Sequence, residues 1–205
     1  MKIHALLFTA ALALPSIALA ESPTPTPTKP APTEKSAKFS ADEVKIVAHL
    51  HHVNQMEVTM GKDAKLKGTA AVKRYGEMLI KDHSTADKEL TALAKKKGLA
   101  KIPAATPATE EEKTEMKTQH DAMMGLKKLK GADFDREYLR MMVEGHDKEL
   151  AKSDVFIATA QDMDLKTALE ARKTSLQRHA DAARELQKGN AQAAATPTPP
   201  AKTGN

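Results

Sequence analysis

Apolar residues recur at alternating steps of three and four along residues 39–189, which is the spacing of one face of an α-helix. No segment alternates apolar and polar residues as a half-buried β-strand would. The pattern predicts an all-α protein with four long helices and one shorter helix. We expect them at these places: Ser40 to Gly68, Thr69 or Ala70 to Gly98, Thr109 to Gly131, Asp133 to Ala160, and Leu165 to Lys188.

Capping residues mark several of these helix ends. Ser40 followed by Glu43, and Thr109 followed by Glu112, have the spacing of capping boxes. In the fourth helix, Asp133 is expected to be the N-cap. Two tight hairpins of long helices, joined by residues 98–132, predict an antiparallel four-helix bundle with an additional helix in the connection.

Each long helix carries one titratable residue in the middle of its apolar stripe. His83, for example, stands between Leu79 and Ala86 on the second helix. At about 1.5 Å per residue, all four groups are expected near mid-bundle, within about one turn of each other. The four residues are Glu57, His83, His146 and His179.

Two interpretations of these four residues remain open at the level of sequence. A carboxylate and three imidazoles that converge in a bundle can hold a single zinc, iron, copper or manganese ion. Alternatively, they form a buried polar network that fixes helix register and binds nothing. Asp82, Asp135 and Arg172 are candidate hydrogen-bonding partners in either case.

A weaker candidate site lies on the third predicted helix. Met116, His120 and Met124 follow one another at a spacing of four, which places them on one helix face. Thioethers together with an imidazole can hold copper. A methionine stripe is more commonly packing material, so this copper site ranks below the mid-bundle site.

Charge and composition exclude several functions. The chain has a formal net charge of +5, few aromatic residues and lysines interspersed with acidic residues, so nucleic-acid binding is not expected. Weak contact with anionic envelope surfaces is compatible with this charge. The chain lacks cysteine, a glycine-rich phosphate loop and a Gly-x-Ser-x-Gly step. The sequence therefore does not indicate a hydrolase or a nucleotide-dependent enzyme.

The two ends of the chain differ from its middle. Residues 1–20 have a basic residue, an apolar run and a terminal Ala-Leu-Ala, which is typical of a cleaved secretory signal. Residues 21–38 form a Pro/Thr-rich spacer and residues 190–205 an Ala/Pro/Thr-rich tail, both expected to be disordered around a bundle domain at 39–189. No later segment is long and apolar enough to cross a bilayer, so we expect a periplasmic protein.

Four segments of the bundle domain resemble a bacterial exported family catalogued as domain of unknown function 4142. The segments are NQMEVTMG (54–61), EMLIKDHSTADKELTALAKKKG (77–98), GADFDREYLRMMVEGHDKEL (131–150) and LQRHADAARELQ (176–187). The resemblance implies a ferritin-like bundle and brings no established activity. Its recurring positions match Asn54, Glu57, Gly61, Asp82, His83, Asp135, His146 and His179, which adds Asn54 to the candidate supporting residues.

Di-iron chemistry does not fit these residues, although ferritin-like folds often hold two irons. Such bundles use a Glu-x-x-His step on two helices. Here Ile80, Val143 and Leu176 stand three residues before the histidines. The sequence therefore favours a non-enzymatic exported bundle with a mononuclear metal site. An envelope interaction protein is the alternative, and a redox enzyme at the same site ranks below both.

Overall fold

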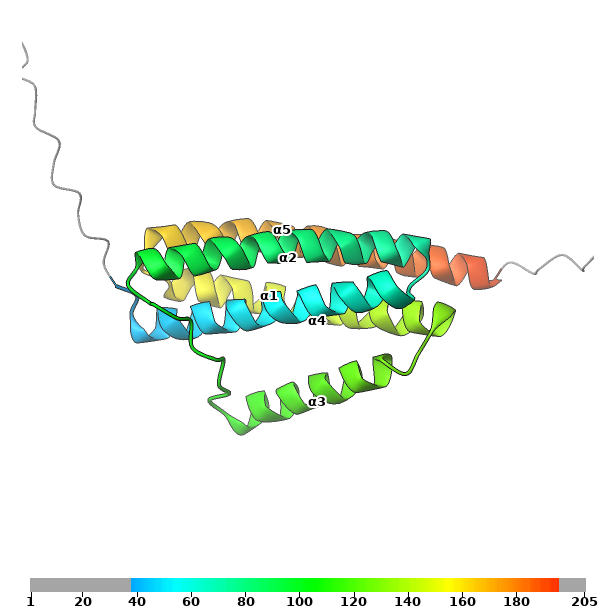
Figure 1. Ribbon diagram of the computed structural model, residues 1–205, viewed down its shortest axis with the longest axis horizontal. Coiled ribbons are helices and arrows are strands. Elements are labelled where there is room, and N and C mark those ends of the chain that lie inside the picture. Colours follow the sequence, from blue (N-terminus) through cyan, green and yellow to red (C-terminus); the bar gives the residue numbers. More distant parts are fainter. Residues whose placement is uncertain (1–37, 196–205) are drawn as a thin grey trace, which may run out of the picture. The chain divides into compact units, whose positions relative to one another are not determined.

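The computed structural model describes residues 38–195, and within that range the chain is all-helical, as predicted (Figure 1). The expected signal peptide and nearly all of the spacer lie outside the described residues, as does the chain beyond residue 195. The five helices are α1 (Ala41–Lys67), α2 (Ala70–Lys96), α3 (Glu110–Leu126), α4 (Gly131–Thr159) and α5 (Met163–Ala195).

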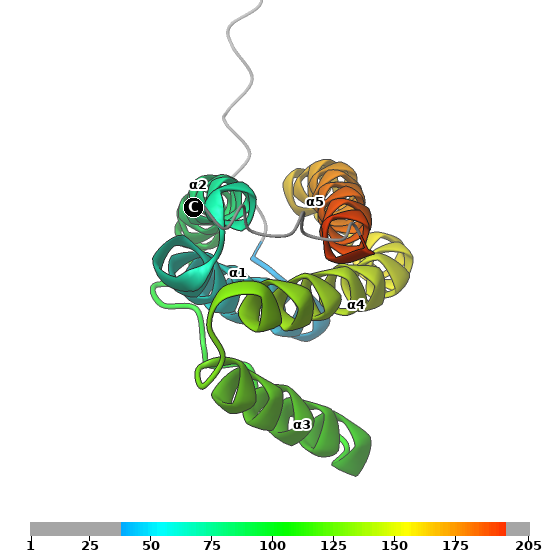
Figure 2. The same cartoon turned by 90° about the vertical axis from the view of Figure 1, so that its right-hand side faces the viewer.

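The four long helices pack lengthwise, and seen from the end they occupy the corners of a square (Figure 2). Helix α1 packs against α2 and α4, and α5 packs against the same two helices from the opposite corner. Contacts at the two ends give the directions. The start of α2 meets the start of α4, where the Thr69 amide donates to Asp135, and the end of α2 meets the start of α5, where Lys97 pairs with Asp162. Neighbouring helices therefore run in opposite directions.

The connection between α2 and α4 has to run the length of the bundle, because α2 ends at the opposite end from the start of α4. Helix α3 forms part of this connection. It lies outside the square, beside α1 and α4 (Figure 2). Of its residues only Leu126 is fully buried, so α3 contributes little to the core.

The helix ends agree with the capping signals in most places. Both predicted capping boxes, at Ser40 and at Thr109, are confirmed. The predicted N-cap at Asp133 is wrong: α4 begins at Gly131, with Lys130 as its N-cap. Gly131 has a φ of 56°, a conformation that glycine tolerates, and with this turn the helix starts three residues earlier than expected.

Two further helix ends differ from expectation. Helix α3 ends at Leu126 and does not reach Gly131. Helix α5 continues past Lys188 to Ala195, because the alanines that follow Gly189 are strong helix formers.

A pair of glycines sets the close approach of α1 and α2. A Cβ atom on Gly61 would lie 2.7 Å from the carbonyl oxygen of Gly76, and a Cβ atom on Gly76 would lie 2.7 Å from Cβ of Ala64. Any larger side chain would push the two helices apart.

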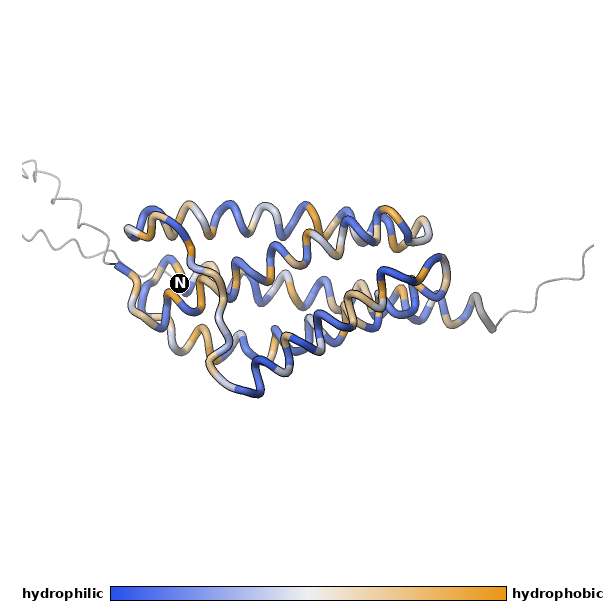
Figure 3. The backbone as a smooth tube through the Cα atoms, turned by 60° about the horizontal axis from the view of Figure 1, so that its bottom comes forward, coloured by the Kyte–Doolittle hydropathy of each residue, from blue (hydrophilic) through white to orange (hydrophobic). Residues whose placement is uncertain are grey.

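Hydrophobic and hydrophilic residues alternate every few positions along each helix (Figure 3). The buried apolar residues form two clusters, and the titratable groups lie between them. One cluster contains Met60, Leu79 and Tyr138, and the other contains Leu50, Leu90 and Leu169. In the described part of the chain, no helix combines the length and the hydropathy needed to cross a membrane.

Candidate metal centre

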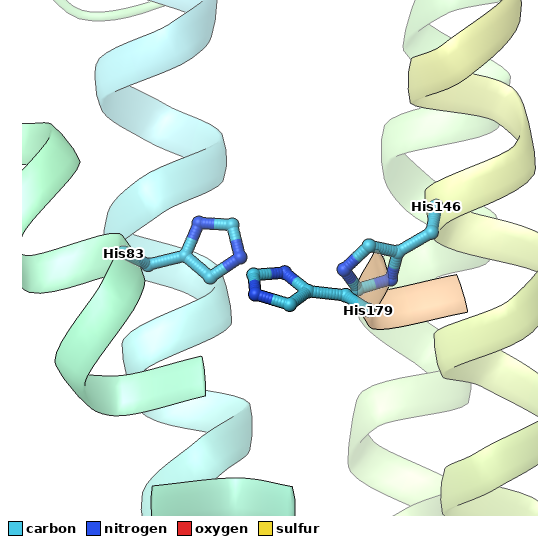
Figure 4. Close-up of side chains that lie close together, drawn as sticks. All are labelled: His83, His146 and His179. Carbon is cyan, nitrogen blue, oxygen red and sulfur yellow. The ribbon is translucent and has the colours of Figure 1, made fainter. Parts of the chain in front are cut away.

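Three histidines from three different helices meet between the two apolar clusters. His83 comes from α2, His146 from α4 and His179 from α5, and their rings converge on one point (Figure 4). The ring centroids are 5.2–6.2 Å apart, and one ligand nitrogen from each histidine lies within 4.8 Å of the other two. All three side chains are buried, with exposed fractions of 4% or less.

Each histidine also has a hydrogen-bonding partner. Nδ1 of His83 lies 3.0 Å from Oδ1 of Asn54, and Nδ1 of His146 lies 2.7 Å from its own helix's carbonyl oxygen at Met142. Nε2 of His179 lies 3.0 Å from the Asp82 carboxylate. Because these oxygens accept hydrogen bonds, each ring places its N–H on the nitrogen that faces the partner.

The remaining nitrogen of each ring is a buried acceptor without a partner. These atoms are Nε2 of His83, Nε2 of His146 and Nδ1 of His179. With the N–H groups assigned to the other nitrogens, these three carry lone pairs and cannot donate to one another. No protein group donates to these three converging lone pairs, and a cation would satisfy all of them.

Burial keeps the rings of His83 and His179 in the neutral form that binds metals. It lowers the pKa of His83 to about 2, an effect to which the neighbouring His179 and His146 rings add. Burial also lowers the pKa of His179, and this effect outweighs the hydrogen bond to Asp82, which acts in the opposite direction. Neither ring has to lose a proton near neutral pH before it can coordinate a metal.

Glu57, the fourth predicted ligand, lies near His146 but outside the converging group. Its side chain is buried, and Oε2 has no hydrogen-bonding partner. Burial raises the pKa of its carboxyl group. The close group of ligand atoms in the described residues nevertheless contains only the three histidines.

The predicted supporting residues take different positions. Asn54 contacts His83, whereas Asp82 accepts from His179 and not from its sequence neighbour His83, because successive helical side chains point about 100° apart. Asp135 does not support a histidine. It accepts from the Thr69 amide at the start of α2, about 16 Å along α4 from His146 at 1.5 Å per residue.

Arg172 belongs to an ion-pair cluster that the sequence analysis missed. Its Nη2 lies 2.6 Å from Glu149, which also accepts from His49 at 3.0 Å. Burial raises the pKa of Glu149, but the hydrogen bond and positive charges around it prevail and bring that pKa to about 2. The spacing could have revealed Glu149, because it follows His146 by three positions and therefore shares its helix face.

The candidate copper residues on α3 do not face the bundle. Met116 and Met124 are 37% and 46% exposed, and His120 is exposed as well. None of the three lines the groove between α3 and the bundle.

A cleft of about 510 Å³ leads from the surface to the histidines. It runs between α2 and α5, and both His83 and His179 line it. A buried metal site needs such an entry path.

Residues 28–186 match the model of the family described as Domain of unknown function (DUF4142). No curated protein and no solved structure matches the chain.

Proposed function

We propose that this chain, which belongs to the family described as Domain of unknown function (DUF4142), is an exported bundle protein that binds one transition-metal ion at His83, His146 and His179. The observation that carries the proposal is the convergence of three buried ring nitrogens without partners. The hydrogen bonds on the outer side of each ring support it, since metal-binding histidines are commonly oriented in this way. Export is supported by the signal-like residues 1–20.

The residues present fit a metal ion of ordinary size. A metal equidistant from three nitrogens 4.8 Å apart would stand about 2.8 Å from each, and zinc prefers roughly 2.0–2.1 Å to imidazole. Each ring therefore needs to move inward by about 0.7 Å at most, which a small side-chain rotation supplies. Imidazole ligands suit zinc, copper and iron, and a site of three histidines leaves a further coordination position open.

The competing explanation is that the histidines only fix the packing of the helices. The partners Asn54, Met142 and Asp82 explain the outer ring nitrogens equally well in that case. The inner nitrogens support the metal site, because no protein group donates a hydrogen bond to them.

Metal content tests the proposal directly. The protein lacking residues 1–20 is purified without a histidine tag and analysed for zinc, copper, iron and manganese, together with His83→Ala, His146→Ala and His179→Ala. His52→Ala is the matched control, since it removes an exposed histidine on α1 that belongs to neither candidate ligand set. We expect one metal per chain in the unmodified protein and in the control, and loss of metal in the other three variants.

Thermal stability gives a second readout. A metal that binds only the folded protein increases the free energy of unfolding, by about 2.7 kcal/mol when the free metal is at a hundredfold excess over Kd. The midpoint of thermal unfolding rises as a result. Absence of bound metal together with an unchanged midpoint for all four metals would return the histidines to a structural role. Export is tested separately by fractionating cells and measuring the intact mass of the periplasmic form, which should begin at Glu21.

A further inference from the structure

Arg172 is a buried cation whose hydrogen-bonding capacity is only partly used. Its side chain is 10% exposed, and Nη2 donates to Glu149. Nε and Nη1 are buried without a partner. A guanidinium remains protonated at any physiological pH, so these N–H groups require acceptors. An unmet requirement of this kind in a cleft points to an anionic ligand.

Glu149 does not supply the missing acceptors, because only Nη2 of Arg172 donates to it. Its two oxygens share the single N–H of His49 Nε2, at 3.0 and 3.1 Å, and Lys152 lies 3.5 Å from one of them. Glu57, the other buried carboxylate near Arg172, makes no hydrogen bond with it. Asp82, at the same cleft, is held by His179 and Arg178. The unpaired nitrogens of Arg172 are therefore left for a group from outside the chain.

The cleft between α2 and α5 joins Arg172 to the histidines. Arg172, His83 and His179 all line it. Its wall is partly polar, with Asp82 and Glu89 among the lining residues, and partly aliphatic. The aliphatic part is formed by Leu50, Leu90, Leu93, Leu176, Ala86 and Ala168. Lys81 and Arg178 also line it, and both are exposed. A volume of about 510 Å³ lies within the range of small-molecule sites.

We propose that this cleft binds a short aliphatic monocarboxylate, with one carboxylate oxygen at the open position of the metal and the other accepting from Arg172. The inference rests on the proposed metal site. The aliphatic part of the wall favours a hydrocarbon chain, and the carboxylates of Asp82 and Glu89 at the same cleft repel phosphate and sulfate, which carry more negative charge than a monocarboxylate. The bound carboxylate would provide a partner for one of the two nitrogens, Nε or Nη1, that lack one.

Butyrate and cobalt provide the probe. The purified protein is loaded with Co²⁺, whose visible absorption reports its ligands, and is titrated with butyrate and, separately, with phosphate. Cobalt content is measured in every sample. We expect butyrate to change the absorption spectrum in a saturable way and phosphate to have no effect at the same concentration.

Two variants test whether butyrate binds in the cleft. Arg172→Gln should raise the half-saturating butyrate concentration by roughly 10- to 100-fold, since hydrogen bonds to charged groups contribute about 1.5–3 kcal/mol. Ala168→Phe should abolish the butyrate response by filling the cleft, without removing a charge or a metal ligand. Thr167→Phe is its matched control, because Thr167 is the exposed neighbour of Ala168 and does not line the cleft.

The outcomes separate the two proposals. Absence of bound cobalt overturns the metal site and this inference with it. Bound cobalt with no response to butyrate overturns the inference alone. A butyrate response that is unchanged in Ala168→Phe also overturns it, and this variant stays informative if Arg172→Gln fails to fold. A response to phosphate equal to that of butyrate would show a general anion site in place of a carboxylate site.

Discussion

Asp82 on α2 accepts a hydrogen bond from His179 on α5, at 3.0 Å from Nε2, although 97 positions separate the two residues in the sequence. This contact holds the Nδ1 atom of His179 toward His83 and His146. A carboxylate behind a metal-binding imidazole orients the ring and raises its basicity. The pair therefore couples the α2–α5 contact to the geometry of the candidate metal centre.

Asp82→Ala should weaken metal binding without unfolding the protein. Loss of a carboxylate that orients a ligand typically lowers metal affinity by roughly 10- to 100-fold. Asp87→Ala is the matched control, because Asp87 is also on α2 and pairs with a different histidine, His51, at 2.6 Å. Competition with a chromophoric chelator measures both affinities. Equal affinities in the two variants would show that Asp82 does not orient His179 for a metal.

Asp135→Ala should lower stability and leave metal content unchanged. Asp135 is 1% exposed and accepts from the Thr69 amide at 3.1 Å, so it caps α2 from a different helix. Loss of a cap costs about 1–2 kcal/mol of unfolding free energy. Urea denaturation measures this loss, and Asp135→Asn should recover part of it by retaining an oxygen. A loss of metal in Asp135→Ala would instead connect this residue to the histidines.

Gly76→Ala should destabilise the α1–α2 hairpin. The added methyl group would lie 2.7 Å from both the carbonyl oxygen of Gly61 and Cβ of Ala64. Overpacking of this kind lowers the free energy of unfolding by about 1–3 kcal/mol. This loss exceeds the stabilisation that alanine provides through its higher helix propensity. Gly145→Ala is the control, because no atom lies within 4 Å of its added methyl group. We expect that variant to gain about 0.5–1 kcal/mol in the same thermal unfolding assay.

Glu43 should make stability depend on pH in the acid range. Its carboxylate accepts from the amides of Ser40, Gln161 and Asp162 at 2.7–2.9 Å and so links the start of α1 to the loop before α5. Burial raises the pKa of Glu43, but these hydrogen bonds together outweigh burial and lower it below the usual 4.5. The carboxylate therefore stabilises the fold fully above pH 4.5, and this contribution is lost as pH falls through the lower folded pKa.

Glu43→Gln tests this pH dependence. At pH 7 the variant should lose about 1.5–3 kcal/mol, the usual contribution of hydrogen bonds to a charged group. The difference from the unmodified protein should shrink below pH 4.5, where the carboxyl group of the unmodified protein becomes protonated. Urea denaturation at a series of pH values measures it. A difference that stays constant down to the acid limit would mean that the charge of Glu43 contributes nothing.

The sequence by itself determined the helices and the residues on their buried faces. Ser40 and Thr109 mark helix starts through contacts only three residues long, and the period of 3.6 places His83, His146 and His179 among apolar residues. The capping contacts and the helical period are both local, so they can be recognised in the sequence without knowledge of the fold. They failed at Asp133 because the backbone turn at Gly131 decided where α4 begins.

Only the tertiary structure decided which of these residues meet. The height and rotation of each helix depend on packing between segments far apart in the sequence, such as the close contact of Gly61 with Gly76. That packing brings three histidines together while Glu57 stays outside the group. It also places Asp82 where it accepts a hydrogen bond from His179. The same packing places Asp135 at the end of the bundle, beside Thr69, and Arg172 in an ion pair with Glu149. Helix periodicity specifies a face, whereas a ligand set requires side chains from separate helices at one level, which only the packed bundle supplies.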